Sequence, residues 1–178
     1  MILIINIVCS IVILTNIVIN FPRIGVSKND YEMNEVGIRS TSLSKENLRE
    51  LVDNEFEISY NYREVDSIKD GSLGTAGILF RDITVVKNMS THETQDKYLY
   101  VIVLTHEIMH LKYFTGDERY TTYKTFKELY ESDNPVLKEM GLYQAWLIIT
   151  RFYPEEYYCG DQIYNQLSKD GYNIRRIN

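Results

Sequence analysis

The sequence predicts an α+β fold, in which one helix and a small sheet are followed by a run of helices. Beyond the N-terminal segment, strand-like alternation and β-branched runs are concentrated between residues 55 and 86. Helical patterns bounded by caps, Gly and Pro then continue to residue 171. Strands that precede helices, rather than alternating with them, are typical of α+β proteins. An uncharged run at the N-terminus predicts an additional element ahead of this domain.

The N-terminal run, MILIINIVCSIVILTNIVINF, contains no charged side chain and is ended by Pro22 and Arg23. As a helix it would span about 30 Å, the thickness of a bilayer core. We therefore predict a transmembrane anchor over residues 1–22 and a single-pass membrane location. A buried core element and a cleaved signal peptide are the alternatives, although the basic start and small-residue cleavage site of a signal peptide are missing. Arg23 and Lys28 follow the segment, which slightly favours a cytoplasmic domain by the positive-inside rule.

Residues 23–42 are polar and irregular, which predicts a linker, and residues 43–178 form the expected domain. The stretch SLSKENLRELVDNE opens this domain as a helix. Ser44 is a preferred N-cap residue, and Leu43 and Leu48 are spaced to form a hydrophobic staple around it.

Two strands are predicted after this helix. EFEISYNY, residues 55–62, alternates apolar and polar side chains, which is strand periodicity. ILFRDITVV, residues 78–86, is short and rich in β-branched residues. Gly71, Gly74 and Gly77 lie between the two runs and predict a loop.

A long helix is predicted from about Thr91 through Tyr113. Residues 98–104 are apolar on every side, which indicates a buried central helix. Gly116 is expected to end this helix, because Gly is preferred just past a helix C-terminus. Three further helices are predicted, one from Asp117 to about Ser132, one from Asn134-Pro135, and one between Pro154 and Gly171.

Charge and cysteine content exclude some classes of protein. The chain has 178 residues and a net charge of −6, and it shows no cluster of Lys and Arg beyond Arg175-Arg176. Phosphate binding requires such clusters, so nucleic acid is not an expected partner. Cys9 and Cys159 are far apart in sequence and predict no disulfide framework.

The most specific pattern is THEIMH, residues 105–110, within the predicted central helix. His106 and His110 are four residues apart and leave the same helix face, so their ring nitrogens can bind one Zn²⁺ at about 2 Å. Glu107 is placed beside the metal, where a carboxylate can take a proton from an activated water. The alternative is two ordinary helix residues. A chance match to the pattern is on the order of one in a few hundred.

The motif resembles that of the zincin metallopeptidases, over about residues 78–132. The resemblance implies that His106 and His110 are zinc ligands and that Glu107 is the general base. It also implies that the strand at 78–86 is an edge strand, which binds an extended peptide substrate by adding it to the sheet. Lys112 departs from the apolar residue that the family usually has near this position.

A catalytic zinc requires three protein ligands and an open position. His92, the remaining histidine, lies upstream and is expected to be a surface or capping residue. In one zincin branch, a Gly three residues after the second His precedes a third ligand three residues further on. Tyr113 and Gly116 occupy these positions here, so that pattern fails.

Gluzincins instead take a Glu from the following helix, and DERYTTYKTFKELYES is loosely similar to that helix in small ImmA/IrrE-type bacterial and phage peptidases. The resemblance implies Glu118 as the third metal ligand, with Asp117 as the alternative; helix capping is the ordinary role for both. Glu128 and Glu131 would lie roughly 15–20 Å along the helix from Gly116, past the histidines.

We therefore expect a zinc-dependent peptidase that hydrolyses peptide bonds of a peptide or protein substrate by metal-activated water. The alternatives are a non-catalytic zinc- or peptide-binding membrane-anchored module of the same fold, and a membrane-anchored interaction protein with an accidental motif. An oxyanion-stabilising group is also expected. Tyr157 and Tyr158 are candidates, although packing is the commoner role for such residues.

Overall fold

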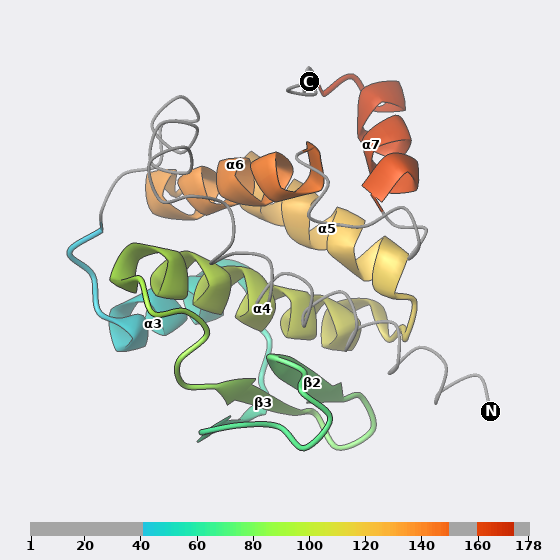
Figure 1. Ribbon diagram of the computed structural model, residues 1–178. Helices are drawn as coiled ribbons and strands as arrows, with labels where there is room; N and C mark the ends of the chain where they lie inside the picture. The colour runs from blue at the N-terminus through green and yellow to red at the C-terminus, as the bar shows by residue number, and fades with distance from the viewer. Residues whose placement is uncertain (1–40, 150–159, 173–178) are drawn as a thin grey trace.

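The computed structural model describes residues 41–149 and 160–172, which form five helices and one three-stranded sheet (Figure 1). In chain order these are α3 (Lys45–Phe56), β1 (Asn61–Val65), β2 (Gly74–Gly77), β3 (Asp82–Val86), α4 (Glu93–Tyr113), α5 (Glu118–Glu131), α6 (Pro135–Ile149) and α7 (Gly160–Lys169). Helix α4 packs against the sheet and α3, and also against α5 and α6 (Figure 1). The predicted α+β class is confirmed.

The predicted membrane location requires correction. Among residues 41–149 and 160–172, no helix combines the length and apolar character needed to cross a membrane. The prediction of a single-pass membrane protein is corrected on this finding. The segment 1–22 that carried the prediction, and Arg23 and Lys28 that oriented it, lie outside the described residues.

Helix α3 begins as predicted and continues further than predicted. The backbone N–H of Asn47 donates to the Ser44 side chain at 3.3 Å, so Ser44 is the N-cap. The strand predicted over residues 55–62 is wrong up to residue 60, because α3 extends to Phe56 and β1 starts only at residue 61. Leu48, Val52 and Phe56 are all buried at a spacing of four residues, and this helical burial outweighs the local alternation.

The sheet order is β1-β3-β2, with β1 parallel and β2 antiparallel to β3. The single strand predicted over residues 78–86 is therefore a turn over residues 78–81 followed by β3. The predicted loop around Gly74 and Gly77 is instead β2. The prediction that the strand at 78–86 lies at the edge of the sheet is wrong, because β3 is the central strand. The edge strand that packs on α4 is β2.

Helix α4 is buried on all sides from Tyr98 to Leu104, as predicted. Its C-terminus differs from the prediction, because Phe114 rather than Gly116 adopts the left-handed conformation, with φ of 48°. The backbone N–H of Phe114 donates to the His110 carbonyl there. The helix ends at Tyr113, so the residue that must adopt the left-handed conformation is Phe114, and Gly116 lies two residues too late to take this role.

The predicted starts of α5 and α6 are confirmed. Asp117 caps α5 by accepting from the Tyr120 backbone N–H at 3.0 Å, and Asn134 accepts from the Val136 N–H at 3.0 Å at the start of α6. Gly171, with φ of 88°, follows α7 as expected, whereas the predicted start at Pro154 lies outside the described residues.

Candidate metal centre

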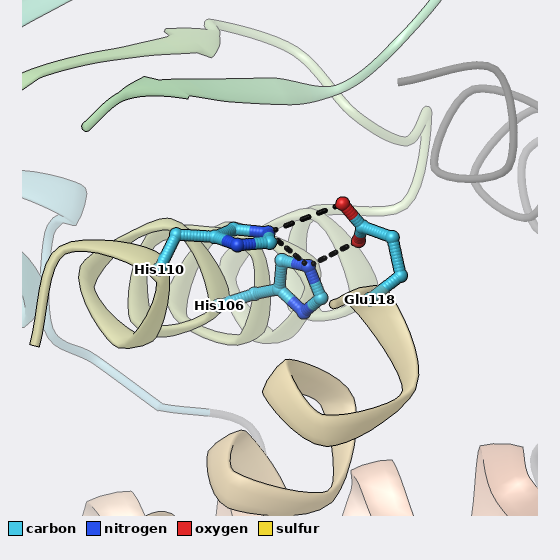
Figure 2. Close-up of side chains that lie close together, drawn as sticks. All are labelled: His106, His110 and Glu118. Atoms are coloured by element: carbon cyan, nitrogen blue, oxygen red, sulfur yellow. Dashed lines mark hydrogen bonds and ion pairs between the residues drawn. The ribbon is translucent and has the colours of Figure 1, made fainter. Parts of the chain in front are cut away.

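His106 and His110 of α4 meet Glu118 of α5 at one point in the structure (Figure 2). His106 Nε2 lies 2.9 Å from Glu118 Oε2, and His110 Nε2 lies 3.3 Å from Glu118 Oε1. The two Nε2 atoms are 3.1 Å apart. One ligand atom from each residue therefore falls within 4.8 Å of the others.

The link between α4 and α5 brings Glu118 back to the histidines. Phe114 ends α4 in the left-handed conformation, and Asp117 caps α5 three residues later. Because the Asp117 side chain satisfies the helix N-terminus, Glu118 is left to face α4 (Figure 2).

The ring of His110 is oriented by groups behind it. Its Nδ1 lies 2.7 Å from the Thr115 carbonyl oxygen and 3.3 Å from Thr121 Oγ1. The Thr121 hydroxyl donates to the Asp117 carbonyl at 2.8 Å, so its oxygen is left to accept from His110. These two oxygen atoms assign a proton to His110 Nδ1. The ring therefore turns Nε2 toward His106 and Glu118, as hydrogen-bond partners behind a metal-binding histidine usually do.

The electrostatics of the cluster favour positive charge between these side chains. Burial lowers the pKa of His110, but the hydrogen bond to Glu118 and the charges of Glu107 and Glu118 outweigh burial and raise that pKa to about 9. Burial raises the pKa of Glu118, but hydrogen bonds with His106 and His110 outweigh it and hold that pKa well below its usual range. The carboxylate thus remains ionised beside an imidazole that holds its proton.

Glu107 lies beside this cluster and is not one of the three converging residues. Its side chain is buried, with 4% of the residue exposed. Burial raises the pKa of this carboxyl, and the nearby His106 and His110 act in the opposite direction. Among the described residues, no side chain or backbone group forms a hydrogen bond with the Glu107 carboxyl, and the strand backbone at Gly74 lies close to it.

Other candidates from the sequence lie away from the cluster. His92 is exposed at the N-cap position of α4, where its side chain makes no capping hydrogen bond. Asp117 is exposed and acts as a helix cap, as its ordinary role implied. Tyr157 and Tyr158 are outside the described residues.

The two acids further along α5 also have other partners. Glu128 accepts from Lys112 at 2.9 Å and from the Tyr113 hydroxyl at 2.6 Å. Glu131 accepts from the Tyr172 hydroxyl. Lys112 stands where the zincin pattern has an apolar residue. Its ammonium group pairs with Glu128 and so links α4 to α5 at the surface, which gives this lysine a structural role.

Sequence reasoning did not identify the groups that support the site. The Thr115 carbonyl is a backbone group and carries no side-chain signal. The Thr121 hydroxyl has one indirect signal, its position one turn after Glu118 on the same helix face.

No family model matches this sequence, and neither a curated protein nor a solved structure matches it. The resemblance to zincins therefore depends on the residues of the motif and their surroundings alone.

Proposed function

We propose that this protein is a zinc-dependent peptidase that hydrolyses a peptide bond in an extended segment of its substrate. The convergence of His106, His110 and Glu118, with Glu107 beside them, is the observation that carries the proposal. The three ligand atoms come from two neighbouring helices and meet within 4.8 Å.

The donor set fits zinc. Two imidazoles and one carboxylate are a ligand set used by catalytic zinc sites, in which a fourth position stays open. The raised pKa of His110 already places a proton between the two Nε2 atoms, which lie 3.1 Å apart, and a zinc ion would replace that proton as the positive charge at this point. A zinc ion bound there would act as a Lewis acid, lowering the pKa of a water molecule to roughly 7 and polarising the peptide carbonyl.

The proposed role of Glu107 is to move one proton. A Glu107 carboxylate oxygen takes the proton from the attacking water as the water oxygen bonds to the carbonyl carbon. The same oxygen then gives the proton to the amide nitrogen as the C–N bond breaks. Burial supports this role, because a raised pKa favours holding the proton between the two steps.

The position of β2 supports an extended peptide as substrate. The backbone oxygen of Leu73 accepts a hydrogen bond from the Val86 N–H at 2.8 Å. In an antiparallel pair of strands, residue pairs that exchange hydrogen bonds alternate with pairs that do not. By this alternation, Gly74 and Ala76 turn their backbone groups away from β3, toward the side of β2 where no other described strand pairs. A peptide that adds to this edge would lie beside Glu107, which is in close contact with Gly74.

Metal content tests the first half of the proposal. We expect close to one zinc ion per full-length chain when the protein is purified without a histidine tag, and loss of that zinc in His106→Ala/His110→Ala. His92→Ala is the matched control, because this third histidine is exposed and outside the cluster, and it should keep its zinc. Folded wild-type protein without zinc would contradict the proposal.

Turnover tests the second half. The zinc-loaded wild type should cleave an unfolded protein such as reduced, alkylated casein. Glu107→Gln should keep its zinc and lose cleavage, because the amide cannot accept the proton. Zinc binding without cleavage in the wild type would instead identify a non-catalytic metal-binding or peptide-binding domain.

A further inference from the structure

Gly74 lies on the edge strand β2, close to helix α4. A Cβ atom added there would lie 2.6 Å from Val103 Cγ1, 2.8 Å from Glu107 Oε1 and 3.0 Å from Glu107 Cγ. Contacts between carbon atoms are optimal near 3.5–4.0 Å, so a side chain at this position would require Val103 and the Glu107 side chain to shift.

Backbone conformation does not explain this glycine. The positive-φ glycines among the described residues are Gly71 and Gly171, so Gly74 has a conformation that other residues can also adopt. The requirement at position 74 is therefore for space. Strand and helix approach each other here because this position carries no side chain.

The close approach determines the surroundings of Glu107. The carboxyl is buried, and among the described residues no hydrogen bond orients it. Glu107 Oε1 and Cγ lie against the strand backbone at Gly74, where a Cβ atom would meet both of them. Packing consequently provides the orientation that hydrogen bonds usually provide for a buried carboxylate.

We propose that Gly74 is a positioning residue for Glu107, which holds the carboxylate beside His106 and His110 by leaving space for it under the edge strand. This inference rests on the proposed peptidase function for its catalytic consequence. The structural part, that residue 74 determines where the carboxylate lies, can be tested without any substrate.

The substrate-free test is the ¹³C NMR signal of the Glu107 side-chain carboxyl, assigned by its disappearance in Glu107→Gln. Gly74→Ala should shift this signal at fixed pH, because the added methyl group displaces the carboxyl. Thr75→Ala is the matched control, since adjacent strand residues point to opposite faces, and it should leave the signal in place. An unchanged signal in folded Gly74→Ala would overturn the proposal.

The catalytic test compares kcat, KM and zinc content in zinc-loaded protein with casein as substrate. Gly74→Ala should lower kcat by about 100-fold with KM and zinc content unchanged, because a misplaced base impairs the reaction step. Thr84→Ala should keep wild-type kcat, because Thr84 lies on the central strand β3, outside the proposed substrate-binding edge, and on the face opposite the Gly74 position. Full kcat in Gly74→Ala would contradict a positioning role.

Val103→Ala separates positioning from helix packing. In the Gly74→Ala/Val103→Ala double variant the contact at 2.6 Å is relieved and the contacts with Glu107 remain. We expect the double variant to keep the low kcat and the shifted NMR signal. Recovery of both wild-type values would assign the glycine to helix packing and overturn the proposal.

If Gly74→Ala alone does not fold, the double variant is used for both the NMR test and the catalytic test. If the wild type cleaves nothing, the peptidase function fails while the NMR comparison still decides the role of Gly74.

Discussion

Asp117 and Glu118 are neighbouring acids that divide two tasks at the start of α5. The shorter Asp117 side chain folds back to cap the helix, while Glu118 reaches His106 and His110. That Glu118 rather than Asp117 meets the two histidines could be predicted only through the resemblance to gluzincins, because helix capping is the ordinary role of both acids. The support of His110 by Thr115 could not, because it depends on how the chain turns after α4.

Exchanging each acid for its amide distinguishes these tasks. Glu118→Gln should weaken zinc binding by about 100-fold, since it removes the anionic ligand. Asp117→Asn should bind zinc as the wild type does, because Asn also caps helices well. Competition with a chelating dye measures both affinities. A larger loss in Asp117→Asn than in Glu118→Gln would reverse the assignment.

The hydroxyl behind His110 gives a second prediction at the same scale. Thr121→Val removes the oxygen 3.3 Å from Nδ1 while keeping the shape of the side chain, and should weaken zinc binding by about tenfold. Thr125→Val is the matched control, because the Thr125 hydroxyl donates to the Thr121 carbonyl within α5 and should leave zinc affinity unchanged. Equal losses in the two variants would point to a general effect on α5.

At the scale of elements, helices were more predictable than strands. The caps at Ser44 and Asp117 act through neighbouring residues, so local sequence carries them. The strand GTAG was predicted as a loop because of its glycines, whereas Gly74 instead lies close to Val103 and Glu107 of α4. Sequence patterns report local conformation, and this contact becomes visible only when strand and helix are packed together.

The surface connection between α4 and α5 predicts a pH-dependent contribution to stability. Burial alone would raise the pKa of Glu128, but hydrogen bonds from Tyr113 and Lys112 outweigh burial and lower it. A lowered pKa in the folded state means that the contribution is complete above the unfolded pKa and is lost as pH falls through the folded value.

Glu128→Gln should therefore destabilise the protein at pH 7 by about 1 kcal/mol, a value reduced by the partial exposure of the pair. Urea unfolding at pH 7 and near pH 3 measures the difference between variant and wild type. We expect that difference to become smaller at the acidic pH, where the wild-type carboxylate takes up its proton. A difference that grows toward acid would contradict the assigned sign.

At the scale of the whole described structure, α4 lies between two groups of elements. It contacts α3 and the sheet on one side and α5 and α6 on the other, and it carries both histidines (Figure 1). The central position of this helix could be predicted from its apolar run. The order of strands could not, because the sequence does not state which neighbour each strand pairs with.

Removal of the proposed zinc ion should destabilise the protein as a whole, since its proposed ligands join α4 to α5. Zinc at 100 times its Kd adds about 2.7 kcal/mol to the free energy of unfolding. Thermal unfolding with and without EDTA should show this loss in wild type and in His92→Ala. The His106→Ala/His110→Ala variant should unfold at the same temperature in both conditions, and a chelator effect there would place the zinc elsewhere.

The three proposed ligand residues lie within one short stretch, residues 106–118, and this has a consequence for the order of folding. Bringing them together closes a short loop, which costs little chain entropy, whereas docking β2 on α4 joins segments that are much farther apart in sequence. We expect α4 and α5 to associate early and β2 to be added later over Glu107. In pulsed hydrogen exchange during refolding, amides of α4 should gain protection before those of β2 and β3. The half of the site proposed to bind metal would then form before the half proposed to position Glu107.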